Sequence, residues 1–351
     1  MNAMTTAGFD ANEVLRRLGN RLKMRHLTLL LNIERLGSLT RVAEKMASSQ
    51  PAVTNALAEL ESMFGAALFD RSVRGMAPTA LGRVVLARAR AMVNDLDHLV
   101  RDMETEIAGR AAHLHIGVVP FVSGQLLSAA LRRTLPQAQG RLTVSLHEGT
   151  SDQLLPWLHD HVVDIVVARA SASLGLEQVS FEMLYRQQPR LIASRRLAAR
   201  LARQPMDWAA LAGLDWILGA PHTPIREQVA DLFLTAGVIP PTPVVESYSA
   251  KLIGEMVVAS DAAVSIVPAD IAEELVRNVG VAIVPFSFDW TLPPIAMFTR
   301  AGGLQRPADR SFAAALRTVC REMYGAVGGS GVTGGVSVAL GGAGDLPVLD
   351  L

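Results

Sequence analysis

A short stretch near the amino terminus combines amide, hydroxyl and methyl groups that can read the edges of base pairs. The stretch contains Ser49, Gln50, Ala52, Val53, Thr54 and Asn55. Gln50 and Asn55 carry the donor–acceptor pair that suits adenine, and the methyl groups of Ala52 and Thr54 can meet a thymine methyl. Ser49 can also cap a helix, a role compatible with a phosphate contact. These residue types indicate base recognition if a helix presents them to a DNA groove.

Arginine side chains around this stretch could contact phosphate groups. The candidates are Arg41, Arg71 and Arg74, since a guanidinium group binds phosphate or enters a minor groove. From Val14 to Arg90 the chain has 13 Lys and Arg residues against five Asp and Glu residues, so this segment carries +8 in a chain of zero net charge. Each arginine alone could be solvated surface. The concentration of positive charge favours a polyanionic partner for this segment.

A second group of candidate residues lies in loops that follow predicted strands. Ligands bind beyond the carboxyl ends of strands in open α/β sheets, and helix N-termini suit a carboxylate or a hydroxyl. The candidates are Pro120, Phe121, Ser123, Thr150, Ser151, Arg169, Gly219, His222, Thr223 and Ser249. Ser123, Thr150 and Ser249 could instead be helix caps only. His222 and Arg226 could recognise an anion, although a surface salt bridge is an equal alternative for Arg226.

Catalytic and metal-binding motifs are missing from the sequence. It has no G-x-S-x-G, H-E-x-x-H, C-x-x-C or Walker A motif. A G-x-G-x-x-G match at 329–334 follows no predicted strand and opens no predicted helix. Histidines are dense only at His113 and His115 and at His159 and His161, and two ligands do not make a metal site. We predict no catalytic residue, no metal and no cofactor.

The candidate base-reading residues between Ser49 and Asn55 need two helices to position them. Apolar residues recur at helical spacing from Lys23, and Ser38 is a candidate N-cap for the next helix. Another helix is predicted to begin after Ser49, with Pro51 tolerated in its first turn and Gly65 as its C-terminal stop. Two short helices joined by a tight turn are typical of a helix-turn-helix.

A longer helix is predicted from about Ala80 to Ala108. Its apolar residues are spaced 4-3-4-3-4, an a/d seam over about three heptads. The seam consists of Val85, Ala89, Met92, Leu96, Leu99 and Met103. About 28 residues give a rod of about 42 Å. Such a stripe favours a dimer, and packing on the chain's own body is the alternative.

The rest of the chain alternates short apolar strands with helices. This pattern predicts a parallel sheet covered by helices, and the length of about 210 residues favours two lobes. Residues 1–20 are predicted to be a flexible leader and residues 325–351, rich in Gly, Ser and Val, a disordered tail. The sequence contains no run of eighteen apolar residues, so no membrane span is predicted. The first twenty residues contain no signal peptide, and the single cysteine, Cys320, fits a cytoplasmic protein.

Several motifs resemble the LysR-type transcriptional regulator family. They are the stretch from Gly37 to Met46, Ser49–Thr54, Leu60-Glu61, Phe64-Gly65, Leu68–Arg71, Gly75 and Pro78–Gly82. The resemblance runs from Met24 to about Ala108 in order, spacing and length, and continues more weakly beyond. Many members of the family have a basic residue where this chain has Asn55.

The resemblance implies a fold class and a domain order. The fold would be α/β, with an N-terminal winged helix-turn-helix over 21–80 and a long dimerisation linker helix over 81–108. A two-lobed, periplasmic-binding-protein-like (type 2) effector domain would span 112–323. Its first lobe would take 112–183 and 285–323, and its second lobe 184–284.

The resemblance also implies a function. The protein would be a bacterial regulator whose operator binding and promoter activation or repression are modulated by a small-molecule effector in the interlobe cleft. The expected partners are double-stranded DNA, the effector, RNA polymerase and further copies of the chain, as a homodimer or homotetramer, without a membrane. The expected location is cytoplasmic and nucleoid-associated. The alternative is a cytoplasmic small-molecule-binding protein or α/β enzyme with a helical dimerisation module, which leaves the +8 charge of the amino-terminal segment unexplained.

Overall fold

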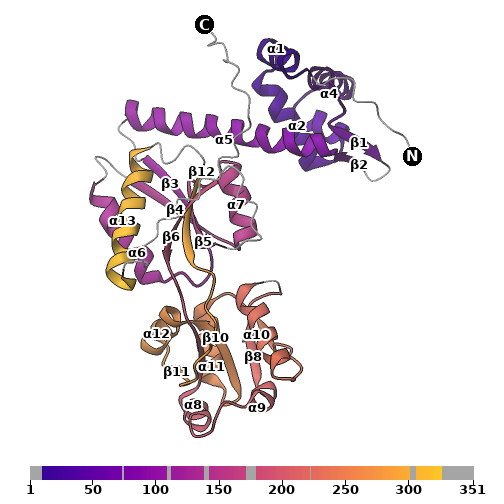
Figure 1. Cartoon of the computed structure of the whole chain (residues 1–351). Helices are drawn as coiled ribbons and strands as arrows, with labels where there is room; N and C mark the ends of the chain where they lie inside the picture. Colours follow the sequence, from indigo (N-terminus) through magenta and orange to yellow (C-terminus); the bar gives the residue numbers. More distant parts are fainter. Residues whose placement is uncertain are drawn as a thin grey trace. The chain divides into compact units, whose positions relative to one another are not determined.

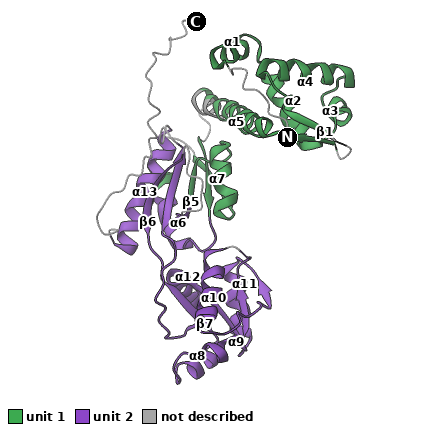
Figure 2. Cartoon of the chain, turned by 45° about the vertical axis from the view of Figure 1, so that its right-hand side comes forward, with its two compact units in different colours: residues 1–118, 134–166 green, residues 119–133, 167–351 purple. Residues whose placement is uncertain are grey.

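The structure is a computed structural model that describes residues 10–72, 75–108, 112–137, 142–170, 179–221, 223–300 and 306–325. The chain divides into two compact units, shown in Figure 2. One unit comprises residues 1–118 and 134–166, and the other comprises residues 119–133 and 167–351.

The first unit begins with helices and a small hairpin (Figure 1). Its elements in chain order are α1 (Ala11–Arg21), α2 (Met24–Leu36), α3 (Leu39–Lys45), α4 (Gln50–Phe64), β1 (Phe69–Ser72), β2 (Gly75–Pro78) and α5 (Ala80–Ala108). Leu30, Ile33, Val42, Leu57 and Leu60 are fully buried between α2, α3 and α4. Because these residues recur at helical spacing, each helix presents one apolar face to a common core.

The hairpin of β1 and β2 packs tightly against its neighbours because two glycines leave room for backbone. Gly75 has a φ of +112°, and a Cβ there would lie 2.6 Å from the carbonyl oxygen of Gly37. The N–H of Met76 donates to that same oxygen at 2.9 Å. At the start of α5, a Cβ on Gly82 would lie 1.9 Å from the carbonyl oxygen of Leu68. The hairpin is thereby fixed to the turn between α2 and α3 and to the first turn of α5.

Helix α1 overlaps the segment that was predicted to be a flexible leader, residues 1–20, and residues 11–20 of that segment are helical instead. Asp10 caps the helix, since its carboxylate accepts the N–H groups of Asn12 and Glu13 at 3.0 and 3.2 Å. None of the residues of α1 is buried. Val14, Leu15 and Leu18 nevertheless recur at helical spacing and could have identified this helix. Residues 1–9 and 326–351, which include nearly all of the predicted disordered tail, lie outside the described residues.

Two five-stranded sheets form the remainder of the fold. One has the order β4-β3-β5-β12-β6, and the other the order β11-β7-β10-β8-β9. The strands of the former are β3 (Ala112–Val118), β4 (Leu142–Glu148), β5 (Ile165–Arg169), β6 (Val179–Tyr185) and β12 (Ile295–Arg300). The strands of the latter are β7 (Pro189–Ala193), β8 (Asp215–Leu218), β9 (Val245–Glu246), β10 (Ala263–Pro268) and β11 (Ala282–Ile283). Strands β5, β7 and β10 are almost entirely buried, as expected for central strands with helices on both faces.

Both sheets are mixed, which corrects the prediction of a parallel sheet. Strand β3 pairs with β4 in parallel, and β8 pairs in parallel with β9 and β10. Strand β6 runs antiparallel to β12, and β7 runs antiparallel to β10 and β11. The alternation of strands and helices breaks at β6 and β7, which follow one another with only residues 186–188 between them. No helix reverses the chain there, so a crossover connection does not form.

Helices cover these sheets. They are α6 (Gly124–Thr134), α7 (Ser151–His159), α8 (Arg195–Leu201), α9 (Trp208–Ala212), α10 (Pro224–Thr235), α11 (Ala250–Ala259), α12 (Ala269–Asn278) and α13 (Pro307–Tyr324). A single 3₁₀ turn, Leu135–Gln137, follows α6. No described helix is both long enough and apolar enough to cross a lipid bilayer.

The thiol of Cys320 is expected to be inert in the folded protein. Cys320 is buried on α13, and burial, followed by the charge of Glu182, raises its pKa to about 12. The thiolate is the reactive form, and its fraction at pH 8 is then on the order of 10⁻⁴. We expect a disulfide reagent at pH 8 to react at least about 100-fold more slowly with the native protein than with the protein unfolded in denaturant. Rapid reaction of the native protein would contradict this burial.

Candidate nucleic-acid interface and ligand loops

The amino-terminal end of α4 presents most of the predicted base-reading residues to solvent. Ser49 is the N-cap of α4, and its hydroxyl accepts the N–H of Ala52 at 3.4 Å. Gln50, Ala52 and Asn55 are exposed. Thr54 is half-buried, and its hydroxyl donates to the carbonyl of Gln50 at 2.9 Å. Its methyl group therefore remains as the group that can contact a base. The exposed amides of Gln50 and Asn55 lie one and a half turns apart at the start of the helix.

Val53 does not belong to this group, contrary to the prediction. Its side chain is 3% exposed and packs in the core of the amino-terminal helices beside Leu57 and Leu60. In an α-helix, positions 53, 57 and 60 share one face. The face that anchors α4 is therefore unavailable to a base.

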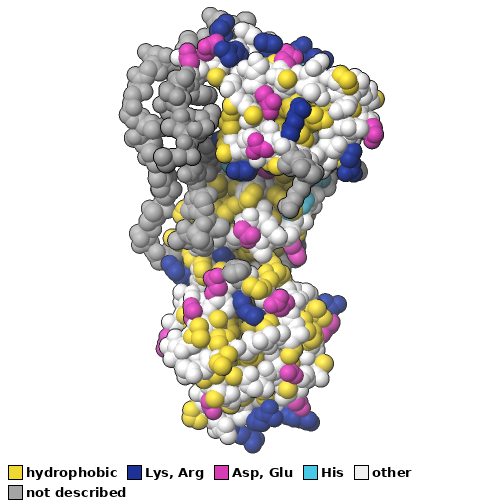
Figure 3. Space-filling model, turned by 90° about the vertical axis from the view of Figure 1, so that its right-hand side faces the viewer, with side chains coloured by type: hydrophobic (Ala, Val, Ile, Leu, Met, Phe, Trp, Pro, Cys, Tyr) yellow, Lys and Arg dark blue, Asp and Glu magenta, His cyan; other side chains and the backbone are white. Residues whose placement is uncertain are grey.

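The predicted phosphate-binding arginines flank α4 on two elements. Arg41 is exposed on α3, and Arg71 is exposed on β1. Arg74 lies outside the described residues. The hairpin that carries Arg71 is tied to α4, because the carboxylate of Glu61 accepts the N–H groups of Leu68 and Phe69 at 2.8 and 3.3 Å. Lys and Arg side chains are also visible at the top of the view in Figure 3, over the amino-terminal helices.

One basic residue of this segment has an intramolecular role. Arg90 on α5 forms an ion pair with Glu34 on α2 at 2.8 Å and another with Asp160, just after α7, at 2.6 Å. On the same face of α5, Asn94 and His98 contact the carbonyl oxygens of Asp160 and of His161. These three positions, each four residues apart, join the middle of α5 to the turn after α7, and Arg90 joins it to α2 as well.

The seam on α5 divides into a buried part and an exposed part. Val85 and Ala89 are 9% and 1% exposed, and Val85 belongs to the core of the amino-terminal helices. Their assignment to dimerisation is therefore wrong, because α5 first packs against its own domain. The remaining four residues of the seam stay exposed, by 42% to 53%: Met92, Leu96, Leu99 and Met103.

Two further apolar residues extend this exposed seam. Val100 is 56% exposed and Ile107, four residues after Met103, is 80% exposed. The predicted alternation of four and three would place Glu106 next, so Ile107 lies one position beyond the seam, on the same side of α5. Exposed large apolar side chains that repeat at this spacing mark a surface for another helix.

Among the predicted ligand residues, Ser123 is the most enclosed. It is 2% exposed and precedes α6, and its oxygen accepts the N–H of Gln125 at 3.2 Å. Its hydroxyl donates to the carboxylate of Glu274 on α12. The predicted capping role is therefore present, together with a carboxylate partner that the sequence did not reveal.

Phe121 and Arg169 are brought together by Gln187, which is buried between β6 and β7. Arg169 donates to the Gln187 side-chain oxygen at 2.6 Å and to the carbonyl of Pro293 at 3.1 Å. The Gln187 amide nitrogen donates to the Phe121 carbonyl at 3.0 Å and to the Asp270 carboxylate at 2.9 Å. Burial lowers the pKa of Arg169 to about 10 and raises the pKa of Asp270. Gln187 and Asp270 thus belong to this cluster, although sequence motifs did not indicate them.

The other predicted ligand residues are helix caps and loop residues. Thr150 precedes α7, which begins at Ser151, and the Thr150 N–H donates to the Gln153 side chain at 3.1 Å. Ser249 caps α11 by accepting the N–H of Leu252 at 3.3 Å. Pro120 is half-buried before α6, and His222 lies outside the described residues.

Gly219 and Thr223 lie together in the second unit. A Cβ on Gly219 would lie 3.0 Å from the Tyr248 ring and 3.3 Å from the Thr223 hydroxyl. That hydroxyl donates to the carbonyl of Ala220 at 2.9 Å and so closes the loop before α10. A side chain at position 219 would therefore be in tight contact with the Tyr248 ring, which would have to move by a few tenths of an ångström.

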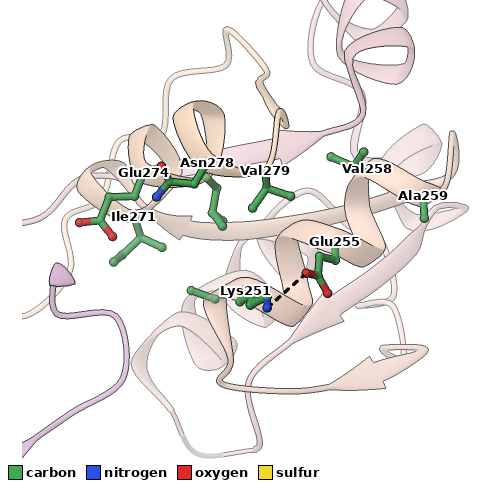
Figure 4. Close-up of a pocket in the computed structure, with 10 residues that line it drawn as sticks. Lys251, Glu255, Val258, Ala259, Ile271, Glu274, Asn278 and Val279 are labelled. Carbon is green, nitrogen blue, oxygen red and sulfur yellow. Dashed lines mark ion pairs between the residues drawn. The ribbon is translucent and has the colours of Figure 1, made fainter. Parts of the chain in front are cut away.

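A groove lies between α11 and α12, and Figure 4 shows the side chains on its two walls. It has a volume of about 650 Å³. Lys251, Glu255 and Val258 line it from α11, and Glu274 and Asn278 line it from α12. Lys251 and Glu255 form an ion pair at 3.8 Å. Glu274 is therefore shared between this groove and the start of α6.

Histidines gather on β3 and β4. The ring nitrogens of His115 and His147 approach to 3.2 Å, and His113 contacts the hydroxyl of Ser145 at 2.9 Å. Over the part of the chain that the structure describes, no group of three or more His, Cys, Asp or Glu side chains has an arrangement that could hold a metal ion.

Two family models match the sequence. The model of the bacterial regulatory helix-turn-helix protein, lysR family, matches residues 24–83. The model of the LysR substrate binding domain matches residues 108–321. Together they cover α2 to α4, the hairpin and both five-stranded sheets, and they leave out α1 and most of α5.

Curated relatives and solved structures agree with these matches. The chain is 27% identical to the HTH-type transcriptional regulator GbpR of Azospirillum brasilense, over 90% of each chain. It is 29% identical to the HTH-type transcriptional regulator PcaQ of Agrobacterium fabrum, over 80% of this chain and 89% of that protein. The crystal structure of full-length CbnR with its target DNA has a TM-score of 0.58 at 22% identity, over 85% of this chain and 100% of that one, and this shows a shared fold.

Proposed function

Because the chain belongs to the LysR family of bacterial helix-turn-helix transcriptional regulators, we propose that it binds an operator through α4 and responds to a small molecule. The observation that carries this proposal is the exposed amino-terminal end of α4. Ser49 caps it, Gln50 and Asn55 point amides to solvent, and the opposite face is sealed in the core. A recognition helix places its amino-terminal residues against base edges in the major groove in the same way.

We further propose that two copies of α5 pair through the exposed seam of Met92, Leu96, Leu99 and Met103. The pairing would present two copies of α4 to one duplex, as operators with two half-sites require. Association of two such dimers into a homotetramer and contact with RNA polymerase belong to the same proposal. Support for the DNA-binding part of this proposal comes from full-length CbnR, which has been solved as a complex with its target DNA.

The proposed domain order follows the elements. The winged helix-turn-helix covers 21–80, the linker helix 81–108 and the effector domain 112–323, with one lobe of 112–183 and 285–323 and another of 184–284. Each proposed lobe contains one of the five-stranded sheets. We propose that the effector binds at the loops carrying Ser123, Arg169, Gly219, Thr223 and Ser249, and that it shifts the population of conformers that bind DNA productively.

Titration of DNA tests the proposal. Duplexes from the region upstream of the gene are compared with scrambled duplexes of the same length by electrophoretic mobility shift at several salt concentrations. We expect nanomolar affinity for one upstream duplex and affinity at least about 1,000-fold weaker for scrambled DNA. If about six phosphates are neutralised, log affinity falls with log salt with a slope near −5. Equal affinity for both kinds of duplex would contradict operator recognition.

A further inference from the structure

Helix α1 lies outside the segment that the helix-turn-helix family model matches. That segment begins at residue 24, whereas α1 spans Ala11–Arg21. The helix contacts α4, and Figures 1 and 2 both show the two helices side by side. Leu22, which follows α1, packs against the core of the amino-terminal helices, and the Lys23 N–H donates to the His26 ring at 3.3 Å. These contacts hold α1 in place beside the proposed recognition helix.

Three basic side chains gather where α1 meets α2, and we call Arg21, Lys23 and Arg25 the basic joint. All three are exposed. Arg21 forms an ion pair with Glu59 on α4 at 3.1 Å. Burial lowers the pKa of His26, and the charge of Arg25 lowers it further. Glu59 and Lys23 also act on this histidine, in opposite directions. The charges of the basic joint and of Glu59 therefore lie close together beside α4.

The basic joint and the hairpin lie on opposite flanks of α4. Glu59 binds Arg21 of the joint, and Glu61 binds backbone N–H groups of the segment that leads into the hairpin. Because each residue of an α-helix turns by about 100°, these two glutamates point about 200° apart around the axis of α4. Asn55, one turn before Glu59, is exposed between the two flanks. The exposed face of α4 thus has a basic element on each side, the joint and Arg71.

A major groove presents phosphate groups to both flanks of a helix that enters it. The groove is about 12 Å wide and about 8.5 Å deep, with one sugar–phosphate backbone along each edge. When Asn55 meets base edges, Glu59 lies about 6 Å further along the helix axis, on the way out of the groove. The flank of Glu59 then faces one backbone, and the hairpin faces the other. A carboxylate at that place repels phosphate unless a cation such as Arg21 cancels its charge.

We infer that the basic joint is a second phosphate-binding surface, through which α1 takes part in holding the same duplex as α4. Lys23 and Arg25 contact the backbone on the side opposite the hairpin, and Arg21 neutralises Glu59 beside them. This inference rests on the proposed function, because it takes α4 as the recognition helix. The side chains of the Arg21–Glu59 pair are 56% and 46% exposed, and such a pair contributes little to folding stability. Its effect is therefore expected in DNA binding.

The first test removes the two expected phosphate contacts from the full-length protein. Lys23→Gln/Arg25→Gln keeps polar side chains at both positions and removes their charge. The matched control, Arg203→Gln/Arg277→Gln, makes the same change at exposed positions of the second unit. At about 0.15 M salt, we expect the joint variant to bind operator and scrambled duplexes at least about tenfold more weakly than the wild type, with a salt slope less steep by about 2. The control is expected to match the wild type, and a joint variant that also matched it would overturn the inference.

The second test separates neutralisation of Glu59 from a structural role of Arg21. Arg21→Ala is expected to weaken binding to every duplex, and Arg21→Ala/Glu59→Gln to regain the wild-type affinity, because the repelling carboxylate is gone. Thermal melts followed by circular dichroism are expected to change little in either variant. A double variant as weak as Arg21→Ala would show that Arg21 does not act by neutralising Glu59, and would overturn that part of the inference.

The proposed function and this inference fail in different ways. Preference of the wild type for operator over scrambled DNA tests operator recognition by itself. If that preference is present while the joint variant keeps the wild-type affinity and salt slope, α4 reads DNA without help from α1. If the wild type shows no preference, operator recognition fails, whatever the joint variant does.

Discussion

Replacing Leu96 and Leu99 together with glutamate is expected to convert the protein to monomers and to lower its operator affinity at least about 100-fold. Both side chains lie on the exposed seam of α5, 42% and 53% exposed, and neither belongs to the buried core of the amino-terminal helices. Burying a leucine side chain contributes roughly 1.5–3 kcal/mol. Loss of two per chain amounts to about 3 kcal/mol or more, and each 1.4 kcal/mol is tenfold in affinity. Facing carboxylates would add repulsion.

The matched control makes the same chemical change outside the seam. Leu234 on α10 and Ile239 in the loop after it are exposed apolar residues, 62% and 85% exposed. Their double replacement with glutamate adds the same charge and is expected to leave the mass of the particle and the operator affinity unchanged. Light scattering after gel filtration and mobility shift measure both quantities. A Leu96→Glu/Leu99→Glu protein that keeps the wild-type mass would show that α5 does not hold the copies together.

Replacing Gln50 or Arg71 with alanine is expected to weaken DNA binding in two distinguishable ways. Gln50 is exposed in the first turn of α4, where an amide can bind an adenine with two hydrogen bonds, a contact that discriminates against the wrong base by about 1–3 kcal/mol. Gln50→Ala should therefore reduce discrimination at one base pair of each half-site by about 5- to 150-fold. Arg71 lies on the hairpin, where contacts to phosphate carry no sequence information.

Arg71→Ala is accordingly expected to weaken binding to every duplex alike and to make the salt slope less steep by about 1. The measurement is a set of titrations against the operator, single-base variants of it and a scrambled duplex, each at several salt concentrations. Arg41→Ala on α3 is a useful companion, because its side chain is also exposed near α4. If Gln50→Ala and Arg71→Ala gave identical profiles over all duplexes, the placement of α4 in the major groove would be wrong.

The elements that bind DNA were the most predictable part of the molecule. Ser49, Pro51 and Gly65 define the ends of α4 through local backbone chemistry, and the family resemblance built on these motifs is confirmed by two family models. The errors were within periodic patterns. Val53 and Val85 fit the predicted faces by spacing, but spacing alone does not distinguish a face that packs on the chain's own core from one that remains exposed.

The ligand loops were predictable in position but not in their contacts. Ser123 and Ser249 were predicted as ligand residues with helix capping as the alternative, and the capping signal could be found because it lies within three residues of each helix. The hydrogen-bond partners in these loops come from far along the chain. Glu274 accepts the Ser123 hydroxyl across 151 positions, and Gln187, which also binds the Phe121 carbonyl, donates to Asp270 across 83. Only the folded arrangement of β6, β7 and α12 brings these groups together.

The contacts of Arg90, Asn94 and His98 along one side of α5 have a mechanical consequence. The guanidinium group of Arg90 pairs with Glu34 on α2 and with Asp160 after α7. Rotation of α5 about its own axis would therefore break at least one of these ion pairs. The hydrogen bonds of Asn94 and His98 to the carbonyl oxygens of Asp160 and His161 also oppose this rotation. Arg90 thereby joins the turn after α7 to α2 through a single side chain, so a change in the position of that turn acts directly on the ion pair with Glu34.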